Sequence, residues 1–140
     1  MIRKGDAGVS SNYLEHANVT VNDPKTSADL LCRVFDWQIR WQGAAMDVGE
    51  TVHVGNANSY IAFYTQSDVA AKSMNTYKVA GAANHLGIVV DDLQDVRNRV
   101  EAEGLSPGEL YDYEPGLRFY FFTPDGIEIE VVSYSQATSD

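Results

Sequence analysis

The sequence predicts an α+β fold made of two βαβββ units. Two segments, EHANVTVNDP with His16 and NHLGIVVDDL with His85, share one order: a polar residue, a histidine, then alternating apolar residues that lead into an aspartate. Their histidines lie 69 positions apart, and an amphipathic stretch follows each segment, at 25–35 and at 93–103. A repeat of this kind indicates that one supersecondary unit occurs twice in the chain.

The first unit, residues 12–66, is expected to contain one strand, one helix and three further strands. Period-two alternation predicts a strand over 14–21. Asp23-Pro24 provides a helix start, and apolar residues at helical spacing continue to Phe35. The three further strands are predicted over 38–42, 51–55 and 59–65, with a turn at 55–58 between the last two.

The second unit, residues 84–135, repeats this order. A strand is predicted over 85–90 and a helix over 93–103, which Gly104 ends. The three further strands are predicted over 108–113, 117–122 and 127–134, with a turn at 123–126 before the last one.

The whole chain is expected to form one domain. It has 140 residues with 44% hydrophobic content, which suits a single packed core. Residues 67–83, rich in small and polar side chains, are expected to be a linker or a short helix between the units. The two ends, 1–11 and 136–140, lack periodicity and are expected to be flexible.

Charge and hydropathy exclude several classes of partner. The net charge is −10, and the Lys and Arg residues are scattered, which disfavours binding to phosphate backbones and to anionic membranes. No apolar run approaches the roughly 18 residues of a membrane span, and the basic start lacks the apolar core of a secretory signal. We therefore expect a cytoplasmic protein that binds a small molecule, with no nucleic acid and no membrane partner.

Side-chain parity predicts which face of each strand meets a helix. In the strands that begin at His16 and His85, the fully apolar set of alternate residues must lie under the helix, which leaves both histidines on the opposite, concave side. In the last strand, residues 127, 129 and 131 form the apolar set, so Glu130 also faces the concave side. Three polar side chains from distant parts of the chain are thus predicted to share one face.

His16, His85 and Glu130 form a candidate metal site with two histidines and one carboxylate. Neutral imidazoles and an anionic oxygen suit Fe, Mn, Ni or Zn as a divalent ion, with positions left open for substrate. The spacing alone is equally compatible with two ordinary strand histidines and an exposed hairpin glutamate. On the residues alone, both interpretations stay open.

Three segments of the chain resemble the vicinal oxygen chelate superfamily, which contains glyoxalases, bleomycin resistance proteins and extradiol dioxygenases. They are EHANVTV with the helix after it, NHLGIVVDD, and RFYFFTPDGIEIEVV, which is similar to the family's closing strand, turn and ligand glutamate. The resemblance covers nearly all of 12–135, with Thr123 in place of the family's usual turn aspartate. It implies a cupped mixed sheet around a central site, one divalent metal ion on His16, His85 and Glu130, and a homodimer.

The two enzyme subfamilies are each matched in part. Ala62 stands where glyoxalase-type members carry a fourth ligand, which would leave a coordination position for water or substrate. Tyr120 stands where extradiol dioxygenases place a substrate-binding tyrosine, and we expect it to hydrogen-bond the substrate or to act as an acid. However, Ala70 and Tyr111 occupy the positions expected for two further histidines of those dioxygenases.

Three other residues are predicted to line the substrate pocket. Arg118 has cavity-facing parity and is expected to orient an anionic group of the substrate, although a surface arginine at a strand start would show the same pattern. Tyr60 and Tyr64 share cavity-facing parity in the first unit. His53 fits a base in the cavity, but a solvated position on the sheet is the simpler interpretation.

We expect an enzyme of the lyase or isomerase type, in which a metal ion chelates neighbouring oxygens of a small substrate and stabilises the oxyanion. Tyr120 and Glu130 are its expected catalytic residues. One alternative is an extradiol-type dioxygenase that uses the same three ligands. Another is a non-catalytic drug-binding protein of the bleomycin-resistance kind, which the acidic charge and the aromatic residues favour and the convergent ligands do not. A metal-dependent transferase for phosphonates is disfavoured, because few Lys and Arg residues lie on cavity-facing strands.

Overall fold

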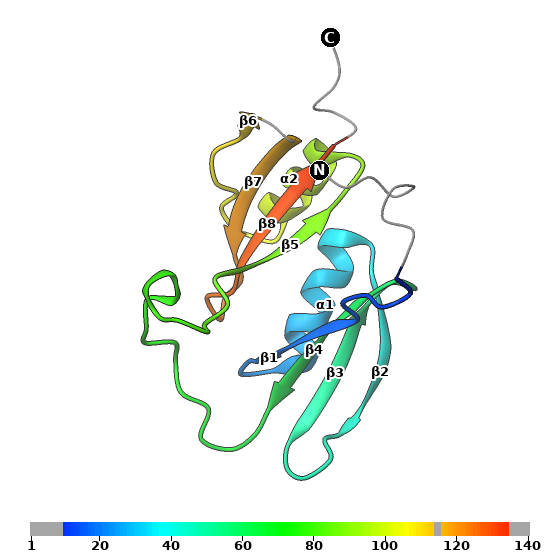
Figure 1. The fold of residues 1–140 in the computed structure, drawn as a ribbon, viewed down its shortest axis with the longest axis vertical. Coiled ribbons are helices and arrows are strands. Elements are labelled where there is room, and N and C mark those ends of the chain that lie inside the picture. The colour runs from blue at the N-terminus through cyan, green and yellow to red at the C-terminus, as the bar shows by residue number, and fades with distance from the viewer. Residues whose placement is uncertain (1–9, 114–115, 135–140) are drawn as a thin grey trace.

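The computed structural model describes residues 10–113 and 116–134. Two βαβββ units follow one another along the chain, and each forms its own mixed four-stranded sheet (Figure 1). The predicted α+β fold with two βαβββ units is therefore confirmed. Of the ends expected to be flexible, residues 1–9 and 136–140 lie outside the described ranges.

The first unit places its first strand beside its last. Its elements are β1 (His16–Thr20), α1 (Pro24–Phe35), β2 (Gln38–Ala44), β3 (Glu50–Gly55) and β4 (Tyr60–Thr65). The sheet order is β1-β4-β3-β2, in which β1 runs parallel to β4 and the other neighbours are antiparallel. Because β1 and β4 pair in register, His16 lies beside Tyr60.

The second unit repeats this arrangement. Its elements are β5 (His85–Val89), α2 (Leu93–Ala102), β6 (Tyr111–Tyr113), β7 (Gly116–Phe122) and β8 (Glu128–Ser133). The sheet order is β5-β8-β7-β6, with β5 parallel to β8. Between the units, the predicted linker contains one 3-10 turn, η1 (Thr76–Lys78), and loops around from β4 to β5 (Figure 1).

Both helices begin at an aspartate that caps free backbone N–H groups. Asp23 accepts hydrogen bonds from the backbone of Lys25 and Thr26, and Asp92 accepts one from Asp95. After α2, Gly104 has a φ of 79°, a left-handed conformation that glycine adopts without steric cost. Asp23-Pro24 and Gly104 are the residues on which the sequence prediction relied, and both helices begin where it placed them.

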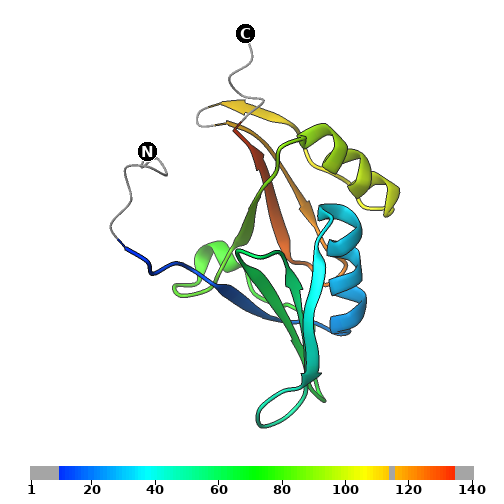
Figure 2. The ribbon, with the colours of Figure 1, turned by 90° about the vertical axis from the view of Figure 1, so that its right-hand side faces the viewer.

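Each helix covers one face of its own sheet and leaves the other face open. The core between helices and sheets is aliphatic and aromatic, and its largest fully buried side chains include Leu31, Val54, Phe63, Phe119 and Phe121. Figure 2 shows α1 and α2 together on one side of the molecule, with the sheets beside them. Within the described ranges, neither helix is long and apolar enough to cross a membrane.

The two units are joined by polar contacts as well as by the linker. Arg33 on α1 forms two hydrogen bonds with Glu103 at the end of α2, at 2.8 and 2.9 Å. Asp125, in the turn before β8, accepts hydrogen bonds from the backbone and side chain of Asn22. These contacts hold the two sheets in one orientation, so the open faces form the candidate functional surfaces.

Candidate functional site

The open face of the second sheet brings together two of the three predicted metal ligands. His85 begins β5, and Glu130 lies on the adjacent parallel strand β8, two residues beyond the register partner of His85. The Nε2 atom of His85 lies 3.0 Å from the Oε1 atom of Glu130. The Glu130 side chain is 11% exposed, and the His85 side chain is 31% exposed. The parity argument therefore places these two side chains correctly.

Arg118 contacts the other oxygen of the same carboxylate. Its Nη1 atom lies 2.6 Å from Oε2 of Glu130, and the Arg118 side chain is also largely buried. A hydrogen bond between two charged groups is among the stronger contacts available to a protein. The sequence analysis assigned Arg118 to the substrate, whereas in this structure its guanidinium group lies against the predicted ligand.

Tyr120 lies directly opposite Glu130 in the antiparallel β7–β8 pair. Its ring meets the His85 ring edge to face, with centroids 5.7 Å apart and an interplanar angle of 88°. Tyr111 on β6 packs against the outer side of Tyr120 in the same manner, at 6.3 Å. Tyr120 therefore borders the His85–Glu130 pair, which is where the sequence analysis expected a substrate-binding tyrosine.

The linker contributes a tyrosine to this face that the sequence analysis did not single out. The hydroxyl of Tyr77, in η1, donates a hydrogen bond of 2.5 Å to Glu128, and the same oxygen lies 3.4 Å from Nδ1 of His85. The hydrogen bond to Glu128, together with burial, raises the pKa of Tyr77 to about 12. No sequence motif links Tyr77 to His85, which lies eight residues further along the chain. This contact depends on the path of the linker, which no local pattern encodes.

Gly87 leaves the space beside Glu130 open. It lies opposite Glu130 in the β5–β8 register, on the same face as His85. A Cβ atom at this position would meet no other atom within 4 Å. Because Gly87 has no side chain, β5 places no side chain between His85 and Val89 on this face that would cover the predicted ligand pair.

The open face of the first sheet carries a stack of aromatic rings. Tyr60 lies between His16 and His53, at centroid distances of 4.9 and 4.6 Å and interplanar angles of 13° and 23°. Trp41 follows His53 at 5.2 Å, and the Arg40 guanidinium lies 4.5 Å above the Tyr60 ring. Four neighbouring rings from β1 to β2 therefore form a continuous series of contacts, here called the aromatic stack (His16, Tyr60, His53, Trp41), in which Trp41 is tilted by 52° to His53.

Glu15 holds the His16 end of the aromatic stack. Its Oε1 atom lies 2.9 Å from Nδ1 of His16 and accepts a hydrogen bond of 3.3 Å from the Tyr60 hydroxyl. The contact with His16 is the main reason that the pKa of Glu15 is lowered. The Tyr64 hydroxyl instead donates to the carbonyl of Val48, at 2.8 Å. Tyr60 therefore belongs to the stack, while Tyr64 contacts the loop between β2 and β3.

His53 lies closer to the candidate site than the simpler sequence interpretation implied. It sits directly opposite Ala62 in the β3–β4 register, and Ala62 is itself opposite Asn18 on β1. Burial, and secondarily the nearby His16, lowers the pKa of His53. A neutral imidazole thus faces the position where glyoxalase-type relatives are expected to carry a ligand and this chain has alanine.

His16 and His85 line one pocket, but three ligands do not converge. A pocket of about 440 Å³ lies between β1 and β5 and is bordered by both histidines, Tyr60 and Gly87. Nevertheless, among residues 10–113 and 116–134 no three His, Cys, Asp or Glu side chains lie close enough together to hold one metal ion. The structure therefore brings together two of the three predicted ligands, His85 and Glu130, and leaves His16 in the aromatic stack.

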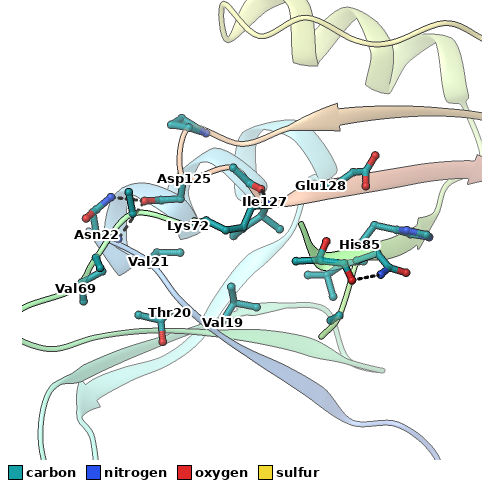
Figure 3. Close-up of a pocket in the computed structure, with 18 residues that line it drawn as sticks. Val19, Thr20, Val21, Asn22, Val69, Lys72, His85, Asp125, Ile127 and Glu128 are labelled. Atoms are coloured by element: carbon teal, nitrogen blue, oxygen red, sulfur yellow. Dashed lines mark hydrogen bonds between the residues drawn. The ribbon is translucent and has the colours of Figure 1, made fainter. Parts of the chain in front are cut away.

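A second pocket, of about 340 Å³, lies where the linker crosses the ends of β1 and β5. Figure 3 shows His85 and Glu128 at one end of this pocket and Asn22 and Asp125 at the other. Lys72 from the linker borders it and donates a hydrogen bond of 2.7 Å to the carbonyl of Gly126. His85 consequently lies at the border of both pockets.

The sequence matches the family model of the Glyoxalase/Bleomycin resistance protein/Dioxygenase superfamily over residues 13–131. The chain therefore belongs to this superfamily, as the three motif segments predicted. No curated protein matches the chain in sequence.

Several solved structures share the fold over nearly the whole chain. A glyoxylase/bleomycin resistance protein/dioxygenase domain from Frankia sp. EAN1pec has a TM-score of 0.74 at 17% identity and covers 89% of this chain and 98% of its own. The trypanothione-dependent glyoxalase I of Leishmania major has a TM-score of 0.71 at 17% identity, with coverages of 90% and 89%. A protein from the mobile metagenome of V. pseudocholerae has a TM-score of 0.62 at 24% identity, with coverages of 91% and 98%.

Proposed function

We propose that this protein is a divalent-metal-dependent enzyme of the lyase or isomerase type that acts on a small substrate with neighbouring oxygens. The observation that carries this proposal is the 3.0 Å contact between Nε2 of His85 and Oε1 of Glu130 on an open face. Two donor atoms that each lie about 2.1 Å from one ion, at right angles, are about 3 Å apart. The spacing of the pair therefore suits two adjacent ligands.

The proton count around this pair is compatible with a bound cation. A carboxylate oxygen only accepts, and a neutral imidazole carries one proton on one of its two nitrogens. The Tyr77 hydroxyl has one proton, and its shorter contact gives that proton to Glu128, so its oxygen accepts from Nδ1–H of His85. Nε2 of a neutral His85 then faces Glu130 with a lone pair. A proton or a metal ion between the two atoms resolves this conflict.

Within one described chain, the residues fit the metal in part. His85 and Glu130 would hold the ion, and we propose His16 as the third ligand because it borders the same pocket. His16 would join the pair either by leaving the aromatic stack or as a ligand from a second copy of the chain.

A homodimer is supported by apolar side chains that remain exposed on the open faces. Val89 and Phe122 on the second sheet and Trp41 on the first are at least half exposed. Exposed apolar groups clustered near a pocket are typical of surfaces that a partner covers. We therefore propose that two copies associate through these faces.

When bound, the ion would supply Lewis acidity to two neighbouring oxygens of the substrate. The residues around the ion would bind and orient the substrate. Tyr120 would hydrogen-bond the substrate beside His85, and Tyr60, which borders the same pocket as His85, would contact it through its ring edge. Arg118 would keep Oε2 of Glu130 engaged, so that Oε1 faces the open side, and would orient an anionic group that reaches it.

The test is the metal content of protein purified anaerobically without chelator. The expected result is about one Fe, Mn, Ni or Zn ion per chain, with a large loss in His85→Ala and in Glu130→Ala. His53→Ala serves as the matched control, because it removes an imidazole outside the proposed ligand set. If all forms are equally empty and added ions do not bind, the proposal fails. Iron with oxygen uptake would instead favour the dioxygenase alternative.

The aromatic stack favours a second candidate, a non-catalytic protein that binds an aromatic or cationic drug. Its rings end in a half-exposed Trp41, on which a planar ligand could stack, and the chain carries a net charge of −10. Under this candidate, tryptophan fluorescence would respond to planar cationic ligands in metal-free protein, and Trp41→Ala would abolish the response. Retained metal binding without such a response would count against it.

A further inference from the structure

We propose that Tyr77, supported by Glu128, is a positioning residue that orients His85 so that its Nε2 atom faces Glu130, where a cation can bind between the two side chains. This inference rests on the proposed function, because it concerns the same histidine. It assigns a role to the linker, which joins the two units in sequence and here also reaches into the candidate site.

The turn that carries Tyr77 is anchored on both sides. The side chain of Asn75 accepts a hydrogen bond of 3.0 Å from the backbone N–H of Tyr77. The side chain of Asn84 donates one of 3.1 Å to the carbonyl of Thr76. Because Asn84 directly precedes His85, the turn and the histidine are tied together by one backbone step. Tyr77 is thus held in place although its side chain is mostly exposed.

The two contacts of the Tyr77 hydroxyl differ in length, and this difference assigns the proton. The 2.5 Å contact with Glu128 is a short hydrogen bond from a neutral hydroxyl to a carboxylate, and it uses the single hydroxyl proton. At 3.4 Å, the same oxygen can only accept from Nδ1–H of His85. Nδ1 then carries a proton, and Nε2 is the nitrogen that faces Glu130 at 3.0 Å, with either a second proton or a cation between the two atoms.

An arrangement of this kind is what a metal-binding histidine requires. A ligand histidine usually donates its other ring N–H to an oxygen, which fixes the tautomer and the direction of the ring. In this chain the oxygen is a phenol whose own proton is held by a second carboxylate. Glu128 and Glu130 therefore act on opposite nitrogens of one ring, Glu128 through Tyr77 and Glu130 directly.

The experiment compares the wild type with Tyr77→Phe, which keeps the ring and removes the hydroxyl. Two readouts are needed: the affinity for Zn²⁺ by calorimetric titration, and ¹⁵N–¹H correlations of labelled imidazoles. The chain has three histidines, so single substitutions assign their signals. We expect Tyr77→Phe to lower the Zn²⁺ affinity about 10- to 100-fold and to shift or broaden the Nδ1 signal of His85.

Glu128→Gln is the second variant, and it keeps the tyrosine. With a neutral amide in place of the carboxylate, the Tyr77 hydroxyl is free to donate to His85, which favours the proton on Nε2. We expect weaker Zn²⁺ binding and an Nδ1 shift in this variant as well. Tyr134→Phe is the control for removal of a phenol hydroxyl, and its Zn²⁺ affinity and His85 signals should match the wild type.

The outcomes separate this inference from the proposed function. Zn²⁺ affinity within twofold of the wild type and an unchanged Nδ1 signal in Tyr77→Phe would overturn the positioning role. If the wild type itself binds no Zn²⁺, the metal proposal fails, and the spectra of the metal-free protein decide the positioning role alone. An Nδ1 signal that changes in Tyr77→Phe and not in Tyr134→Phe would then support it, and one that changes in neither would overturn it.

Discussion

Gly87 lies directly opposite Glu130 in the parallel β5–β8 pair and borders, together with His85, the pocket between β1 and β5. This relationship yields two opposite expectations for one substitution. A Cβ atom at position 87 would meet no atom within 4 Å apart from its chain neighbours, so the protein should tolerate Gly87→Val. Valine also favours a strand over glycine, which should leave stability unchanged or raise it by about 0.5 to 1 kcal/mol.

In contrast, Gly87→Val should weaken binding at the site, because its methyl groups would stand beside the His85–Glu130 pair. The measurement is urea unfolding alongside Zn²⁺ titration of the same samples. The expected pattern is normal or increased stability with at least a tenfold loss of affinity, close to the loss in Glu130→Ala. Unchanged affinity would mean that ligands reach Glu130 from another side.

Arg118 and Glu130 should be strongly coupled in stability. Both side chains are nearly buried, with Nη1 and Oε2 2.6 Å apart. Removing one partner of a buried ion pair leaves an uncompensated charge, which typically costs about 3 to 5 kcal/mol. We expect Arg118→Met to destabilise by about this amount and Arg118→Met with Glu130→Gln to be more stable than the single variant. Additive losses in a double-mutant cycle from urea unfolding would contradict the coupling.

The contact between Arg33 and Glu103 should make stability depend on pH on the acidic side. The hydrogen bond from Arg33 lowers the pKa of Glu103 below its ordinary value. A carboxyl group with a depressed pKa in the folded state stabilises the protein above its unfolded pKa, and this contribution is lost as the pH falls through the folded pKa. The stabilisation is therefore complete at pH 7 and disappears on acidification below the ordinary glutamate range.

Glu103→Gln tests this expectation. Because the Arg33 side chain is more than half exposed, the loss at pH 7 should be only about 0.5 to 1 kcal/mol. At pH 3 the variant and the wild type should approach each other in stability. Glu101→Gln, on the exposed side of the same helix, is the control. A difference that persists unchanged at pH 3 would show that the carboxylate charge is not the cause.

Asp125 should be important for the docking of the two units. It accepts hydrogen bonds from the backbone and side chain of Asn22 and, more weakly, from the hydroxyl of Ser27. Asp125→Ala removes these acceptors, and we expect a loss of about 1 to 3 kcal/mol in urea unfolding. Asp47→Ala, in the exposed turn between β2 and β3, should change stability by less than about 0.5 kcal/mol. Equal effects of the two variants would mean that this contact between units contributes little.

The fold and the facing of its strands were predictable from the sequence because both depend on short-range periodicity. Alternation with period two assigns each strand residue to a face, and the side with only apolar residues must meet the helix. This reasoning placed His85 and Glu130 on one open face, where the structure has them 3.0 Å apart. The aspartates that begin the helices act within a few residues, so their effect could also be read locally.

The contacts of the site were decided by tertiary structure. Parity says that Arg118 faces the cavity, but only the pairing of β7 with β8 brings its guanidinium group to Glu130. The role of Tyr77 depends on how the linker crosses the second sheet, which no periodic pattern specifies. The position of His16 likewise follows from the pairing of β1 with β4, which sets its ring against Tyr60. The sequence by itself determines which residues share a face of each unit, whereas the docking of the units determines which faces meet, because that docking rests on contacts between residues far apart in the chain.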